Sequence, residues 1–457
     1  MKKKLSLFLL LLSILFFLIL KLSYLSVRIS DTNLYFYHGY KLLTPQLLYK
    51  DTFFFNLPLF AYISSIYYLI TSGDIVMFYA TALLEVAVIT FLTFFIVYTK
   101  TKNYTVSVIS SLLYMFSSIV LVTSDHQTGV FTASIFIVLS YLFLEKKYFL
   151  ISGVFAGLSL LTKAYFLPIV LSFTVYLLFI KKDYKHFFHF IAGFISSTIV
   201  IISPFLILAR KEFMADLLFS LTRTGGTKQD IIYLFLRYDF ILFSVFIFNL
   251  FNFKKNSLFA LISLFSIAIF FFYQGLYYLY LNFIIPFLAI SFYNLSHFLV
   301  QKRHLLKIVL PMIVLFAIGI NIVMYVIHFS NLGSVENIDT IIKLIKKENP
   351  KYLYGAVEIT PALAYLSQKP LLDNIINTNK KGFIKKILDS KKLTQKAIKT
   401  KTIIVARGTY VSQLNIGDAV IDEIFDKDLL RKYCHHLASF PIYTADETNR
   451  INLLKCY

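Results

Sequence analysis

Long apolar segments alternate with short polar connections along the first three quarters of the chain. The first apolar run extends from residue 5 to about residue 27, and eleven more follow at 55–72, 75–98, 104–123, 128–144, 148–162, 165–180, 187–209, 231–253, 257–273, 276–299 and 306–329. Their lengths centre on about 20 residues, which is what an α-helix needs to cross a bilayer. The pattern therefore predicts a mainly α-helical, polytopic membrane bundle over residues 1–329.

From about Ser330 the apolar runs shorten and polar residues appear regularly. Residues 343–347 fit an amphipathic helix, and residues 352–357 and 402–406 fit buried strands. We therefore expect a small α/β domain over residues 330–457. Its two cysteines, Cys434 and Cys456, can form at most one disulfide and lack metal-ligand spacing.

The composition supports the membrane assignment and excludes other classes. The chain has 457 residues, of which 58% are hydrophobic and 15% charged, whereas a soluble domain has about 25% charged residues. The 49 Phe and 32 Tyr exclude a disordered chain. The net charge of +21 is assigned to topology-determining loops and to a basic domain facing lipid head groups, so no nucleic-acid partner is expected.

Positive charges predict the orientation in the plasma membrane. Lys2–Lys4 precede an apolar run too long for a cleaved signal peptide, so the N-terminus is expected in the cytoplasm. Basic clusters occupy every second connection: Lys100/Lys102, Lys146/Lys147, Lys181/Lys182/Lys185, Lys254/Lys255 and Lys302/Arg303. They share the cytoplasmic side only if 55–72 lies on the outer leaflet without crossing. This gives about eleven spanning helices, a first external loop over 28–74 and an extracytoplasmic C-terminal domain.

The first external loop begins with a carboxylate surrounded by aromatic residues. Asp31 can act as a general base for an acceptor hydroxyl, because burial moves a carboxyl pKa toward the working range. Its alternative role is to cap a helix over 32–43. Asp51, after Tyr49 and Lys50, is either a second acid or a cap of the following segment.

Three further external positions carry polar side chains that suit a phosphorylated substrate. They are the turn at Asp125-His126-Gln127, Lys163, and Arg223 in the loop 210–230, with Arg210, Lys211 and Arg237 as nearby alternatives. Arginine is suited to bidentate phosphate recognition. The structural alternatives are a solvated turn for residues 125–127, a snorkelling side chain for Lys163 and a solvated loop charge for Arg223.

These features, in this order, resemble the polytopic C-type glycosyltransferases, in particular the branch of protein O-mannosyltransferases and the lipid A aminoarabinose transferase. The matching elements are Asp31 with Tyr35, the pair Tyr49 and Asp51 before Pro58-Leu59, the turn at Asp125, and Gly153-x3-Gly157-x4-Thr162-Lys163. The order of the motifs and their predicted membrane side carry the resemblance, which covers residues 25–230 best. The family's usual charged residue and two prolines are replaced here by Asn56-Leu57-Pro58.

The resemblance implies transfer of a sugar from a polyprenyl-phosphate donor to an acceptor at the outer face, with inversion. It implies catalytic roles for Asp31 and Asp51 and donor-phosphate binding by Lys163, Arg223 and Arg237. The substrate-binding candidates are Tyr35, His38, Tyr49, Asp125 and His126. No Asp-x-Asp motif is present, so no metal ligand is assigned, although a divalent cation remains an open alternative.

Two other function classes compete with this interpretation. A transporter or lipid-carrier flippase would show ionisable residues at mid-bilayer and related halves, whereas the spans between Phe187 and Phe329 carry almost no charge. A non-catalytic subunit with the same fold is the third alternative.

Overall fold

The computed structural model describes residues 2–220, 228–272, 277–302, 305–378, 382–383, 388–408, 424–443 and 449–456. The chain forms two compact units. Unit 1 comprises Met1–Tyr24, Asn56–Phe60 and Ala80–Ser330, and unit 2 comprises Leu25–Phe55, Ala61–Tyr79 and Asn331–Tyr457. Most of the first external loop thus belongs with the C-terminal domain, whereas the sequence boundary at 329/330 groups it with the membrane helices.

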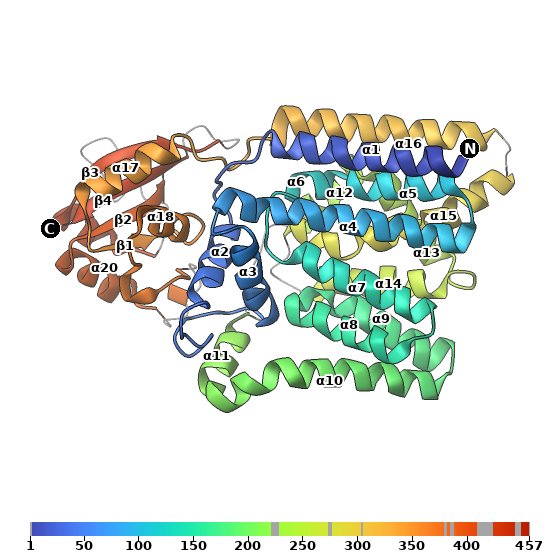
Figure 1. The fold of residues 1–457 in the computed structure, drawn as a ribbon, viewed down its shortest axis with the longest axis horizontal. Helices are drawn as coiled ribbons and strands as arrows, with labels where there is room; N and C mark the ends of the chain where they lie inside the picture. The colour runs from blue at the N-terminus through green and yellow to red at the C-terminus, as the bar shows by residue number, and fades with distance from the viewer. Residues whose placement is uncertain are drawn as a thin grey trace. The chain divides into compact units, whose positions relative to one another are not determined.

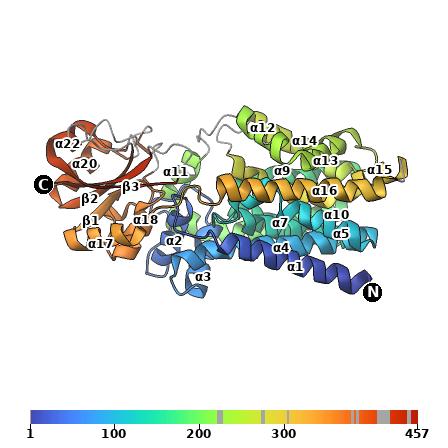
Figure 2. The ribbon, with the colours of Figure 1, turned by 90° about the horizontal axis from the view of Figure 1, so that it is seen from above.

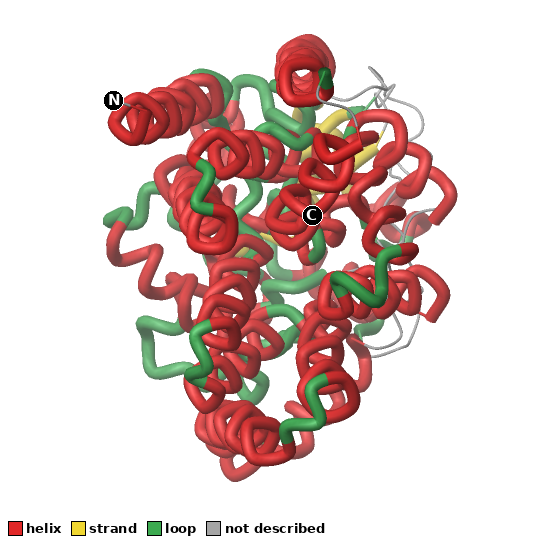
Figure 3. Tube along the Cα trace, turned by 90° about the vertical axis from the view of Figure 1, so that its right-hand side faces the viewer, coloured by secondary structure: helices red, strands yellow, loops and turns green. Residues whose placement is uncertain are grey.

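Unit 1 is a bundle of helices whose long members run nearly along one direction (Figures 1 and 2) and are seen end-on in Figure 3. In chain order the helices are α1 (Lys2–Leu22), most of α4 (Ile75–Thr101), α5 (Tyr104–Met115), α6 (Ser118–Thr123), α7 (Val130–Glu145), α8 (Phe149–Thr162), α9 (Leu167–Val175), α10 (Tyr184–Leu208), α11 (Arg210–Ser220), α12 (Lys228–Tyr238), α13 (Phe240–Phe251), α14 (Ser257–Phe272), α15 (Ile285–Lys302) and α16 (Leu306–Met324). Short helical segments accompany them: η1 (Ala164–Phe166), η2 (Tyr176–Ile180), η3 (Tyr278–Phe283) and η4 (Tyr325–Phe329).

Each predicted apolar segment is helical, but several are short or broken. Four of the described helices are long and apolar enough to cross a membrane: Lys4–Leu22, Ile75–Thr101, Tyr184–Leu208 and Ile308–Phe329. The pair α12 and α13 adds a fifth span if counted together, although it is bent by 106°. The chain therefore has the apolar helices of a multi-pass membrane protein, while the count of eleven spans stays a prediction.

Two sequence assignments change in detail. The first half of the predicted loop 210–230 is not a loop but the helix α11. The predicted non-spanning segment contains α3 (Leu59–Ile70), whose 12 residues rise about 18 Å against a hydrocarbon core of about 30 Å. That length agrees with a helix that does not cross, although the topology itself stays a prediction.

The two glycines of the Gly-x3-Gly segment allow α8 and α10 to pack closely. A Cβ at Gly153 would collide with the carbonyl oxygen of Phe190, and one at Gly157 with Ser197. Gly193 on α10 has the same relation to Leu150 on α8. Small residues let membrane helices approach to backbone contact, so these glycines have a packing role that positions the end of α8.

Unit 2 contains α2 (Thr32–Lys41), most of α3, and the C-terminal domain. That domain comprises α17 (Ile338–Glu348), β1 (Tyr352–Gly355), α18 (Thr360–Ser367), η5 (Leu372–Asn374), α20 (Ser390–Lys399), β2 (Thr402–Gly408), α22 (Lys427–Tyr433), β3 (Cys434–Pro441) and β4 (Arg450–Cys456). The strand order is β1-β2-β4-β3, with β1 and β2 parallel and the other neighbours antiparallel.

The small sheet is covered on both faces, as a buried strand requires. Figure 2 shows α20 and α22 on one face and α17 and α18 on the other. Cys434 and Cys456 lie opposite each other in β3 and β4 and form a disulfide. The predicted small sheet is present, and β1 and β2 begin at the two segments expected to be strands, 352–357 and 402–406.

The start of the first external loop pairs with the C-terminal domain. Arg28 forms an antiparallel bridge with Ser334, and the Ile29 amide donates to the carbonyl of Gly333 at 2.8 Å. The next segment, at Val335, pairs with Ile442. Further along, aromatic side chains of α2 and α18 meet, with the rings of Phe36 and Tyr365 4.8 Å apart. The loop and the domain therefore share one folded core.

Candidate functional site

The turn at residues 124–129 in unit 1 is buried and not solvated. Asp125 is 1% exposed, and its Oδ2 lies 3.2 Å from Nζ of Lys21, a fully buried lysine in the last turn of α1. Lys21 also donates to the carbonyl of Leu121 at 2.6 Å and to the hydroxyl of Tyr325 at 2.9 Å. A buried ion pair is stable when its remaining hydrogen-bonding groups are satisfied in this way. The turn is therefore fixed by an ion pair to the first helix.

His126 is the one side chain of this turn that reaches solvent. Its side chain is 30% exposed, and its Nδ1 lies 2.8 Å from Oδ1 of Asp125. An ionised Asp125 accepts a hydrogen bond, which assigns the proton to Nδ1 and leaves Nε2 on the outer side of the ring. The arrangement is a carboxylate-oriented imidazole, a group that can transfer a proton or hold an anion.

Glu85 in α4 holds the other half of the turn. Its Oε2 accepts from Nε2 of Gln127 at 2.9 Å, and its Oε1 accepts from the hydroxyl of Thr132. The Gln127 side chain in turn accepts from the amide of Gly129 at 3.2 Å. Glu85 is 5% exposed. The sequence analysis missed both Glu85 and Lys21, although a lone ionisable residue in an apolar span signals a structural or functional role.

Lys163 and the turn contact the same aromatic ring. Gly129 has φ +83°, and a Cβ at this position would collide with the ring of Phe60. The Nζ of Lys163 lies 5.6 Å from the centre of that ring. Lys163 follows the last residue of α8 and is half-buried, with an extended backbone. Lys163, Phe60 and the turn of Asp125 and His126 therefore form one cluster, which we call the Phe60 cluster.

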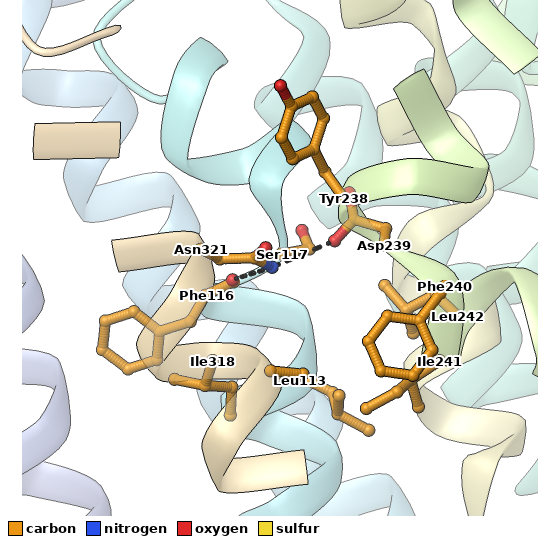
Figure 4. A pocket seen from close by; sticks show the side chains of 11 residues that line it. Leu113, Phe116, Ser117, Tyr238, Asp239, Phe240, Ile241, Leu242, Ile318 and Asn321 are labelled. Atoms are coloured by element: carbon orange, nitrogen blue, oxygen red, sulfur yellow. Dashed lines mark hydrogen bonds between the residues drawn. The ribbon is translucent and has the colours of Figure 1, made fainter. Parts of the chain in front are cut away.

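A third buried carboxylate, Asp239, positions the helix that leads into the turn (Figure 4). Asp239 sits at the break between α12 and α13, and its two oxygens accept the amides of Ser118 and Ile119 at 2.8 and 3.2 Å. Asn321 on α16 donates to the carbonyl of Phe116 at 3.1 Å. These bonds surround a cavity of about 10 Å³. They fix the start of α6, whose other end enters the turn.

In unit 2, Asp31 occupies the N-cap position of α2, but its side chain makes no capping hydrogen bond. Instead, the hydroxyl of Ser30 accepts the amide of Thr32 at 3.2 Å. The Asp31 side chain is exposed. Asp31 thus lies at the start of a helix, as predicted. The capping hydrogen bond comes from Ser30 instead, and the Asp31 carboxylate is accessible for chemistry.

The backbone around Asp31 is fixed on both sides. Nδ2 of Asn33 donates to the carbonyls of Arg28 and Glu358 at 2.7 and 2.6 Å, and the hydroxyl of Tyr79 lies 3.0 Å from Oδ1 of Asn33. Arg28 and Asn33 are both buried. Asp31 is therefore an exposed carboxylate on a rigid frame.

The aromatic candidates of the first loop pack inside it. Tyr35, His38 and Tyr49 are at most 3% exposed and all contact the ring of Phe54, with centroid distances of 6.3, 4.8 and 5.9 Å. Burial lowers the pKa of His38 to about 3, so its ring is neutral at physiological pH. These side chains build the loop, and their predicted contact with substrate stays a prediction.

The remaining candidates lie apart from these groups or outside the described residues. Asp51 is exposed and accepts the amide of Leu47 at 2.6 Å, which closes a turn. Arg237 is exposed and lies over Tyr233 and Tyr238 at the end of α12, with ring distances of 5.9 and 5.2 Å. Arg223 lies outside the described residues.

Three solved structures have a similar fold over nearly the whole of this chain. The structure of ArnT from Cupriavidus metallidurans in the apo state superposes with a TM-score of 0.64 at 11% identity, covering 99% of this chain and 98% of that one. The same enzyme bound to undecaprenyl phosphate gives 0.62 at 11% identity, covering 98% and 97%. The Archaeoglobus fulgidus oligosaccharyltransferase in complex with Zn and sulfate gives 0.53 at 11% identity, covering 96% and 72%.

These comparisons establish a shared fold. No protein-family profile and no curated protein matches the sequence.

Proposed function

We propose that the protein is a membrane glycosyltransferase that moves a sugar from a polyprenyl-phosphate donor to an acceptor at the outer face of the membrane. The observation that carries the proposal is the likeness of fold over nearly the whole chain to ArnT, a protein crystallised with undecaprenyl phosphate. The exposed Asp31 directly after the first helix supports it, because a transferase needs an accessible base for its acceptor.

In the proposed reaction the acceptor hydroxyl attacks the anomeric carbon of the donor sugar. Asp31 takes the hydroxyl proton, the bond from the anomeric carbon to the phosphate oxygen breaks, and the polyprenyl phosphate leaves with inversion at carbon. Lys163, together with Arg223, neutralises the departing phosphate. Fixed charges at the position where negative charge develops are the main source of such rate enhancement.

The side of the membrane is supported by the disulfide. Cys434 and Cys456 are bonded in the C-terminal domain, and structural disulfides persist in oxidising compartments. The positive clusters in the connecting loops support the same orientation, with this domain outside the cytoplasm.

The test is release of label from radiolabelled polyprenyl-phosphate sugars by purified protein in liposomes, with a crude membrane fraction as the source of acceptors. Wild-type protein should release the label from at least one sugar. Asp31→Asn should lower the rate by about 10²-fold or more, because Asn cannot accept the proton. Its melting temperature should not change, because the Asp31 side chain makes no capping bond.

Asp339→Asn is the matched control, since Asp339 is another exposed carboxylate of unit 2, in the first turn of α17. A fully active Asp31→Asn protein would move the base to Asp51. A wild-type protein that releases no label from any polyprenyl-phosphate sugar would overturn the proposed function.

A further inference from the structure

We propose that His126, oriented by Asp125, is a second catalytic residue, which binds the phosphate of the leaving lipid carrier and gives it a proton. This inference rests on the proposed function and deepens it. It states that the turn at residues 124–129 of unit 1 binds a phosphate monoester and supplies a proton that the reaction uses.

The first support is the geometry of the pair. Asp125 is buried, whereas His126 is the part-exposed member of the turn, and the bond from Nδ1 to Oδ1 is 2.8 Å. A hydrogen bond to one imidazole nitrogen fixes the ring orientation and presents the other nitrogen to solvent. An imidazole held in this way can act on a substrate without losing its orientation.

The second support is the set of charges that face the pair. Lys21 from α1 lies 3.2 Å from Asp125, and Tyr325 of η4 shares the Lys21 ammonium. Glu85 from α4 is bonded to Gln127, the next residue of the turn, and to Thr132. Lys21 keeps Asp125 ionised although it is buried, because an opposite charge at this distance favours the charged form. An ionised Asp125 then accepts the hydrogen bond from Nδ1 of His126 and holds the ring in place.

The third support is the position beside a second cation. Gly129, three residues after His126, touches the ring of Phe60, and Lys163 lies over that same ring. The turn also leads into the N-terminus of α7, which begins at Val130, and the amide end of a helix favours negative charge. The Phe60 ring thus links the Lys163 ammonium to the turn that carries the His126 imidazole and leads into α7, and these groups together suit a phosphate.

The step balances as follows. As the bond between the anomeric carbon and the phosphate oxygen breaks, its electron pair stays with that oxygen. The Nε2–H of the His126 imidazolium transfers its proton to the phosphate, which leaves as a monoanion, and the ring becomes neutral. The acceptor proton is taken up by Asp31. Solvent then returns one proton from Asp31 to His126, so that no proton is gained or lost over the cycle.

The experiment measures the pH dependence of label release for wild-type protein and for His126→Gln. The wild-type rate should fall with rising pH, because only a protonated donor can give its proton to the phosphate. His126→Gln should lose this limb and react about 10²-fold more slowly. Imidazole added to His126→Gly should restore part of the rate with the wild-type pH limb. His297→Gln, an exposed histidine on α15, is the matched control and should behave as wild type.

A second readout does not depend on turnover. Farnesyl phosphate serves as the probe, and its ³¹P resonance is titrated with pH in the presence of the protein. Contact with His126 should add an inflection that is missing in His126→Gln. If wild-type protein releases label while His126→Gln keeps the same rate and pH limb, the inference is wrong and the proposed function stands. If no label is released but the inflection is present, the phosphate site stands and the transferase function falls.

Discussion

The buried pair of Lys21 and Asp125 gives the sharpest stability prediction. Lys21→Met keeps the length of the side chain and removes its charge, while Asp125 remains buried with His126 as its partner. Asp125→Asn performs the reverse change and removes the carboxylate that lies beside the lysine. The double variant removes both charges. These three variants and the wild type form a double-mutant cycle.

The magnitude follows from the geometry. The two charged atoms are 3.2 Å apart and both side chains are at most 1% exposed. At an effective dielectric constant of about 20, two unit charges at this distance attract each other by about 5 kcal/mol. Removing one partner of a buried pair costs about 3–5 kcal/mol, because the other charge is left uncompensated. We therefore expect each single variant to lose this amount and the double variant to lose less than either.

The assay is the free energy of unfolding of the purified protein in mixed micelles, measured by titration with sodium dodecyl sulfate. Lys100→Met is the matched control. Its ion pair with Glu145 is 2.7 Å long but 22% and 38% exposed, so its loss should cost under about 1 kcal/mol. A coupling energy below about 0.5 kcal/mol between Lys21 and Asp125 would refute the reasoning.

Three more outcomes are expected. Because the pKa of His38 is about 3 in the folded chain and about 6.5 when unfolded, the unfolded state binds the proton first as the pH falls. Stability should thus decline by up to about 1.4 kcal/mol per pH unit between pH 6.5 and 3, and thermal melts of His38→Phe should lack this decline. Lys163→Met should slow label release by about 10²–10³-fold with an unchanged melting temperature; an unchanged rate would exclude Lys163 from the phosphate site. A cysteine at Ser72 should react with an impermeant reagent from outside and one at Lys102 only after permeabilisation; the reverse would invert the topology.

The helices were largely predictable because apolar length is a local property. The segment predicted at 187–209 is α10 (Tyr184–Leu208), and that predicted at 75–98 is α4 (Ile75–Thr101). The breaks were not predictable. The break at Asp239 depends on amides 120 and 121 residues earlier in the chain, and no local pattern reports such a partner.

The candidate site shows the same division. Asp31 and Asp125 were found because each is a carboxylate at the end of an apolar segment, where a polar residue is conspicuous. Lys21 was missed because its structural role depends on the hydroxyl of Tyr325, which is 304 residues later in the chain. Glu85 was missed because a single acid in an apolar span looks the same whether it holds a turn or faces a neighbouring helix. The burial of His38 and Tyr49 could not be predicted either, because polar aromatic residues occur both on binding surfaces and inside packed loops.

The bridge between Arg28 and Ser334 has a consequence for the biosynthesis of the chain. Residues 27–30 leave the ribosome among the first, whereas their partners at 333–335, and Ile442 beyond them, are made after the last membrane helix. The loop that carries Asp31 therefore lacks these partners until residues 333–335 have been synthesised. A chain truncated after residue 330 would lack the segment with which this loop pairs. Folding of the Asp31 region is therefore coupled to synthesis of a segment about 300 residues later in the chain.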